Sequence, residues 1–152
     1  MNYAHIHLIL NHIPVIGIGF VTLLLIVAVV RKSGELITAA LGFTIMVSLA
    51  TVPVYLTGPL AEGVLEDLHL PDVSKERIEA HEEKAEMAFI SIEAAGALAI
   101  ITLFARRYSS KLGSMVIVLT LLALIISGGL VAWTADLGGK IHHQEIRSDT
   151  GP

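Results

Sequence analysis

Four long stretches of the chain are almost free of charge, and this feature limits the possible folds more than any other. Residues 3–30, 36–61 and 112–135 contain no Asp, Glu, Lys or Arg, and residues 87–105 contain only Glu93. A helix needs about 20 apolar residues to cross about 30 Å of hydrocarbon. The mean hydropathy of +0.74 is also higher, and the charged fraction of 16% lower, than a soluble domain shows. The sequence therefore predicts four transmembrane helices.

The predicted fold is an all-α integral membrane bundle with up-down-up-down order, formed as a single domain by residues 1–152. We expect the second span to end at Thr57, Gly58 and Pro59, and the fourth to end at Gly138 and Gly139. Ser74 is expected to cap a long helix that leads into the third span. The expected spans cover residues 9–30, 36–58, 84–105 and 112–136, with an outer segment at 59–83 and a tail at 138–152.

The loop charges predict an orientation. The two short connections, residues 31–35 and 106–111, hold five of the ten Lys and Arg residues but only one of the fourteen acids. Basic loops stay in the cytoplasm. We therefore expect a multi-pass protein of the bacterial inner membrane, with its N-terminus and C-terminus both on the periplasmic side. The acidic outer side suits a basic soluble partner, although a merely solvated surface explains the same charges.

The absence of cysteine limits the chemistry. It excludes disulfides, thiolate metal sites and covalently attached haem. The N-terminus lacks the basic region and small-residue cleavage site of a signal peptide, so the first span is expected to remain in the protein. No nucleophile–base pair, phosphate-binding loop or zinc-protease motif occurs, so an independent enzyme is the least expected class. Nothing predicts a nucleic-acid partner.

All seven histidines are expected on the outer side. Ordinary loop composition explains His5, His69 and His142. His12 lies in an apolar run that already enters the membrane, where an unpaired polar side chain is costly. His81 leads into the third span. Below it, one helix face carries small or apolar residues that would make room either for a flat macrocycle or for a closely packed helix: Ala85, Ala88, Ile92, Ala95 and Ala99.

The spacing of His7 and His12 corresponds to about 140° on an ideal helix, so the two would not share a face of a regular helix. Glu93, the only charge inside a span, is interpreted either as part of a proton relay or as a protonated, hydrogen-bonded structural residue. The second interpretation is favoured.

Four short motifs occur in a fixed order. An H-x4-H-x-P pattern runs from His7 to Pro14, and a P-x3-T-G pattern follows from Pro53 to Gly58. His81 begins the third span, and a G-G-x-I-x-H-x-E pattern starts at Gly138. Together these resemble an uncharacterised family of bacterial four-helix membrane proteins that is known only as a domain of unknown function. The resemblance extends over nearly the whole chain and implies that its recurring histidines are His7, His12, His81 and His143.

Three functions are compatible with these residues. The first is a membrane electron-transfer subunit, in which His7, His12, His81 and His143 ligate one or two b-type haems and electrons pass between quinol or a membrane-complex partner and a periplasmic cytochrome c. The second is a copper- or other metal-binding accessory protein that uses the same histidines. The third is a purely structural subunit of a larger membrane complex. We favour haem, because the small residues below His81 provide room for a macrocycle that a copper ion does not need.

Overall fold

The computed structural model describes residues 2–68, 73–143 and 146–147, with the side chain of His142 excepted. The described chain is helical, with α1 (Tyr3–Leu10), α2 (His12–Val30), α3 (Gly34–Leu68), α4 (Lys75–Tyr108) and α5 (Ser110–His142). Four segments within it are long and apolar enough to cross a membrane: Tyr3–Val30, Gly34–Leu68, Lys75–Tyr108 and Ser110–Ile141. The prediction of four membrane-compatible helices is confirmed at this level.

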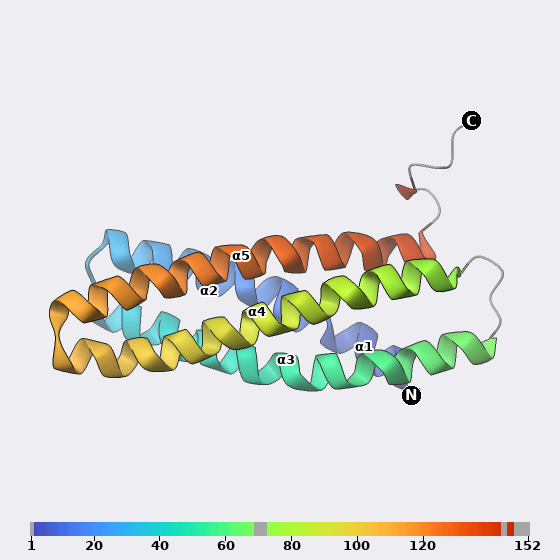
Figure 1. The fold of residues 1–152 in the computed structure, drawn as a ribbon, viewed down its shortest axis with the longest axis horizontal. Coiled ribbons are helices and arrows are strands. Elements are labelled where there is room, and N and C mark those ends of the chain that lie inside the picture. The colour runs from blue at the N-terminus through green and yellow to red at the C-terminus, as the bar shows by residue number, and fades with distance from the viewer. Residues whose placement is uncertain (1, 69–72, 144–145, 148–152) are drawn as a thin grey trace.

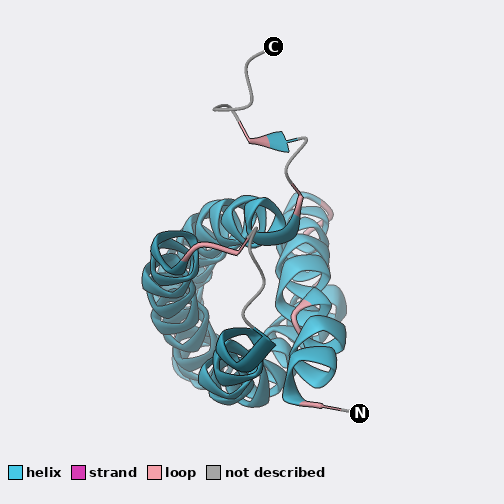
Figure 2. Ribbon diagram, turned by 90° about the vertical axis from the view of Figure 1, so that its right-hand side faces the viewer, coloured by secondary structure: helices cyan, strands magenta, loops and turns pink. Residues whose placement is uncertain are grey.

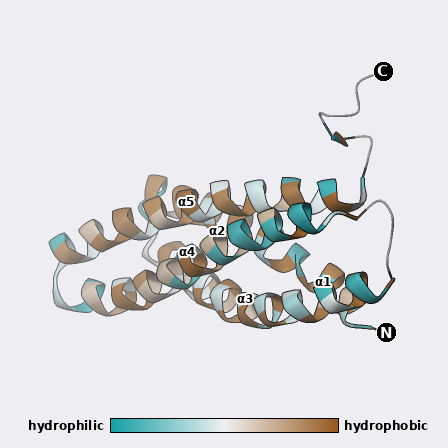
Figure 3. Ribbon diagram, turned by 45° about the vertical axis from the view of Figure 1, so that its right-hand side comes forward, coloured by the Kyte–Doolittle hydropathy of each residue, from teal (hydrophilic) through white to brown (hydrophobic). Residues whose placement is uncertain are grey.

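The helices run up and down around a common axis (Figures 1 and 2). Neighbouring contacts join α2 to α3, α3 to α4, α4 to α5 and α5 back to α2. The start of α1, the end of α3, the start of α4 and the end of α5 lie together at one end, which we call the histidine end. The short connections after α2 and α4 lie at the other, which we call the short-loop end. Apolar residues cover the middle of the bundle (Figure 3).

The core of the bundle is built from small and branched apolar side chains on α2, α3, α4 and α5. It includes Ile18, Val21, Leu25, Ala88, Ile92, Ala95 and Leu124, all of which are buried. The small side chains on α4 let the helices approach closely, as is common in membranes. Outward-facing residues are large and apolar, as expected beside lipid. The small-residue face below His81 is thus used largely for helix packing. Its members Ala88, Ile92, Ala95 and Ala99 are buried, which corresponds to the closely packed helix, one of the two uses that the sequence allowed for this face.

The expected helix end at Gly58 and Pro59 is wrong. The helix α3 continues through both Pro53 and Pro59 to Leu68, and α5 likewise continues past Gly138 and Gly139 to His142. A proline removes one helical hydrogen bond and crowds the preceding turn. Both prolines lie on the exposed side of α3, where the surrounding helices do not oppose the necessary bend. The outer segment is therefore shorter than residues 59–83.

The start of α4 agrees with the sequence prediction. The Ser74 side chain accepts a hydrogen bond from the backbone N–H of Arg77, and α4 then runs without a break past His81 to Tyr108. The first span, by contrast, is interrupted at Asn11, which separates α1 from α2. Pro14 has no N–H to donate to the Leu10 carbonyl, so the helix lacks a bond at this point.

Candidate functional site

Two of the four predicted ligands, His7 and His81, lie near one another at the histidine end. His7 belongs to α1 and His81 to α4, and both are half-buried. The two imidazoles are close enough to interact electrostatically. They come from different halves of the chain, so the bundle fold itself brings them together.

His7 is held against α3. Its Nδ1 lies 3.2 Å from the carbonyl oxygen of Val54 and 3.1 Å from Oγ1 of Thr57. A carbonyl only accepts hydrogen bonds, so Nδ1 carries the proton and donates it. The lone pair of the neutral ring is then on Nε2. Gly58 lies beside the same ring, and a Cβ atom there would be 3.8 Å from Cε1 of His7.

His81 is held in the same way against α5. Its Nδ1 lies 3.0 Å from the carbonyl oxygen of Thr134, which again assigns the proton to Nδ1 and the lone pair to Nε2. Gly138, one turn further along α5, lies beside the ring, and a Cβ atom there would be 3.0 Å from Cε1 of His81. Each half of the chain therefore presents one imidazole. His7 of α1 is anchored on α3 next to Gly58, and His81 of α4 is anchored on α5 next to Gly138.

The two anchored rings lie beside a seam where neighbouring helices do not pack. Within the described residues, α1 packs on α3 and α2 but makes no contact with α5, although α2 and α5 pack together further along the bundle. The α2–α5 packing therefore lies nearer the short-loop end, and α1 does not continue it at the histidine end. His7 is on the helix on one side of this seam, and His81 packs on the helix on the other.

The other two predicted ligands have different surroundings. His12 is exposed, and its Nδ1 bonds the Leu8 carbonyl of its own chain segment at 2.9 Å. His7 and His12 have no common partner, and the interruption at Asn11 lies between them. His143 is exposed and follows the last turn of α5. Of the three histidines that ordinary loop composition explains, His5 is exposed, whereas His69 and the side chain of His142 are outside the described residues.

Within the described part of the chain, no three His, Asp or Glu side chains form a group that could hold a metal ion. The His7–His81 pair therefore supplies two nitrogen ligands, and no described residue supplies a third. A haem iron needs only two axial ligands, because the macrocycle provides the rest. Copper and zinc sites usually take three or four protein ligands. The donor set thus fits haem better than it fits a bare metal ion.

Several residues around the pair belong to the motifs noted in the sequence. Thr57 and Gly58 close the P-x3-T-G pattern, and Gly138 opens the G-G pattern; the structure places them beside His7 and His81 respectively. Motifs far apart in the sequence thus converge at one site. The Thr134 carbonyl was not predicted, because a backbone acceptor leaves no signal in the residue type.

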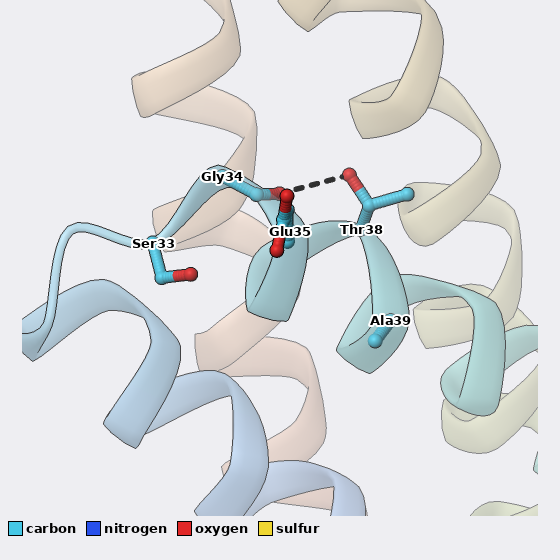
Figure 4. Close-up of a pocket in the computed structure, with 5 residues that line it drawn as sticks. All are labelled: Ser33, Gly34, Glu35, Thr38 and Ala39. Carbon is cyan, nitrogen blue, oxygen red and sulfur yellow. Dashed lines mark hydrogen bonds between the residues drawn. The ribbon is translucent and has the colours of Figure 1, made fainter.

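A hollow at the short-loop end is lined by Ser33, Gly34, Glu35, Thr38 and Ala39 (Figure 4). Arg106 of α4 bonds across to this region, donating to Oγ1 of Thr38 at 3.0 Å and to the Gly34 carbonyl at 3.2 Å. These bonds tie the two short loops together. The hollow contains no histidine and is at the opposite end from the imidazole pair, so we do not treat it as the functional site.

Comparison with known proteins gives no identification: no family model, curated protein or solved structure matches the chain. The resemblance to the uncharacterised four-helix family therefore stays a prediction. What the structure itself defines is a membrane-compatible four-helix bundle with an anchored imidazole pair at one end.

Proposed function

We propose that the chain is a membrane electron-transfer subunit that holds one b-type haem between His7 and His81. The observation that carries this proposal is the matched anchoring of the two imidazoles. In each, Nδ1–H is donated to a backbone carbonyl of a neighbouring helix, at 3.2 Å from Val54 and 3.0 Å from Thr134. Such bonds to ligating histidines fix the ring and make Nε2 a better ligand. A haem bound there would supply one-electron chemistry at low cost in rearrangement.

The protein residues would contribute position and environment. Thr57 adds a second contact to Nδ1 of His7, and Gly138 lets the His81 ring lie flat against α5. The two-haem form of the prediction would need His12 and His143, which are exposed. The geometry therefore favours one haem at the His7–His81 pair.

The charges support a direction for electron transfer. At the junction of α3 and α4, four acidic side chains interact electrostatically near the histidine end: Glu62, Glu66, Glu79 and Glu82. The short loops at the other end are basic. By the positive-inside rule we place the short-loop end in the cytoplasm and the imidazole pair near the periplasm of a bacterial inner membrane. A quinol or a membrane-complex subunit would donate electrons, and a basic periplasmic cytochrome c would accept them.

The test is the visible spectrum of the purified protein in detergent. We expect a dithionite-reduced b-type spectrum that is lost in His7→Ala and in His81→Ala. His5→Ala is the matched control, because His5 is exposed on the same helix as His7. Helical content by circular dichroism would show that each variant folds. His12→Ala is expected to keep the spectrum.

Three results would decide against this function. A haem spectrum that persists in the His7→Ala/His81→Ala double variant would reject the pair as the ligands. Stoichiometric copper without a haem band would favour the metal-accessory function. Neither cofactor, even after expression with added haem precursor and copper, would favour a structural subunit of a membrane complex.

A further inference from the structure

One carboxyl group lies inside the bundle, far from the imidazole pair. Glu93 is the only Asp or Glu in residues 87–105, and it lies twelve residues, or about 18 Å of helical rise, below His81. Its Oε2 accepts a hydrogen bond of 2.8 Å from Oγ of Ser48 on α3. Its Oε1 is buried and has no hydrogen-bond partner among the described residues. A buried polar atom without a partner in an apolar span requires an explanation.

The position of this carboxyl is set by an unusually close approach of two helices. A Cβ atom on Gly96 would lie 2.4 Å from Oγ of Ser48 and 2.6 Å from its Cβ. Only glycine at residue 96 therefore lets α4 reach α3 at this level. Ser48 is 5% exposed. The Ser48–Glu93 bond is thus made within a tight, water-poor contact, in which side chains have few alternative positions.

The membrane-spanning stretches that surround Glu93 carry no positive side chain that could balance its ionised form. Residues 13–30 of α2, 36–61 of α3 and 112–135 of α5 contain no Asp, Glu, His, Lys or Arg. The other titratable side chain in these stretches is Tyr55, whose ring stacks on Phe89 at 4.2 Å between centroids. An isolated carboxylate in such apolar surroundings is very costly.

We infer that Glu93 is an intramembrane proton-binding site, with the proton on Oε1 and the Ser48 hydroxyl bonded to Oε2. The ligand is the proton and not a metal ion. A hard cation takes six or more oxygen ligands, whereas the described residues place one hydroxyl on this carboxyl and form no group of three potential metal ligands. The site is separate from the His7–His81 pair and does not depend on haem.

Infrared difference spectroscopy of the full chain in lipid provides the first test. Comparison of wild type with Glu93→Gln at neutral pH should show the carbonyl band of a protonated carboxylic acid in wild type only. This variant keeps the side-chain volume and an oxygen that accepts from Ser48. Ser48→Ala should shift the band without removing it, because the hydrogen bond to Oε2 is lost while the proton stays. A carboxylate band in place of the acid band would overturn the inference.

A lipid-soluble carbodiimide tests whether this proton exchanges with the aqueous phase. A carboxylic acid adds across one C=N bond of the reagent: its proton passes to a nitrogen, its oxygen bonds the central carbon, and the acyl group then migrates to nitrogen. The N-acylurea product retains every atom. We expect one adduct on the peptide that contains Glu93, formed more slowly as the pH rises, and none there in Glu93→Gln.

A water-soluble carbodiimide serves as the control, since it should label exposed outer carboxyls such as Glu83 equally in both proteins. A Glu93 adduct whose rate is independent of pH would show a fixed structural acid and reject exchange. Protection of Glu93 by sodium at constant pH would show that the site prefers a metal cation, and would also overturn the inference. Neither readout depends on haem, so failure here is distinguishable from failure of the proposed electron-transfer function.

Discussion

The ring of His81 lies against Gly138 so closely that a methyl group on residue 138 would be 3.0 Å from Cε1 and 3.2 Å from Nδ1 of the imidazole. The same ring donates its Nδ1–H to the Thr134 carbonyl one turn earlier on α5. The orientation of His81 is therefore set by a backbone acceptor on one side and by the absence of a side chain on the other.

Gly138→Ala should accordingly lower haem retention by about tenfold or more, the range typical when the support of a ligand is disturbed. The added methyl group would push the imidazole away from Thr134 while leaving both ligands in the sequence. Gly129→Ala is the matched control, because a Cβ atom at this position of α5 meets nothing within 4 Å. The measurement is haem per protein from the reduced spectrum. Equal loss in both variants would show a general effect on α5.

Thr57→Val tests the support of the other ring. The substitution keeps the shape of the side chain but removes Oγ1, which lies 3.1 Å from Nδ1 of His7, and leaves the Val54 carbonyl as an acceptor. We expect haem affinity to fall by about tenfold, at the lower end of the usual effect. Thr57→Ser retains the hydroxyl and should behave like wild type in a haem titration. Similar affinities for the valine and serine variants would remove Thr57 from the site.

Gly96→Ala should destabilise the bundle by about 1–3 kcal/mol, because the added methyl group would overlap Ser48 and force α3 away from α4. Gly42→Ala should have little effect or be slightly stabilising, since a Cβ atom there meets no other atom within 4 Å. Thermal unfolding in detergent would compare the two.

The double variant Ser48→Gly/Gly96→Ala should recover much of the lost stability, because it exchanges the small residue between the two helices. If stability is not recovered, the loss in Gly96→Ala does not come from overlap between the side chains at residues 48 and 96.

The orientation can be tested directly because the chain contains no cysteine. Single cysteines at Ser74, before α4, and at Ser110, at the start of α5, lie at opposite ends of the bundle. An impermeant maleimide should label Ser74→Cys in intact spheroplasts and Ser110→Cys only after the membrane is opened. The reverse pattern would place the imidazole pair on the cytoplasmic side.

The sequence was sufficient for the parts of the fold that depend on composition and local chemistry. Absence of charge located the four long helices, and Ser74 located the start of α4 correctly. The predicted stop at Gly58 and Pro59 was wrong, because a proline at an exposed helix position costs one hydrogen bond and a bend but does not end a helix that is held by its neighbours.

The candidate site was predictable in part for the same reason. The apolar surroundings singled out His12 and His81, whereas His7 was marked only by the resemblance to the four-helix family. The pairing of His7 with His81 depends on how two hairpins pack, and the acceptors at Val54 and Thr134 are backbone atoms. Ser48 likewise gave no signal as the partner of Glu93, because their contact depends on the close approach that Gly96 permits.

The small helix α1 differs from the rest of the bundle in a way that bears on the imidazole pair. It packs mainly on α3, and the four long helices keep all their mutual contacts without it. Asn11 and Pro14 form a joint between α1 and the span that follows. His7 therefore belongs to the short helix α1, whereas His81 belongs to the long helix α4. Loss of the α1–α3 packing would therefore remove one imidazole of the pair without removing any contact among the other four helices.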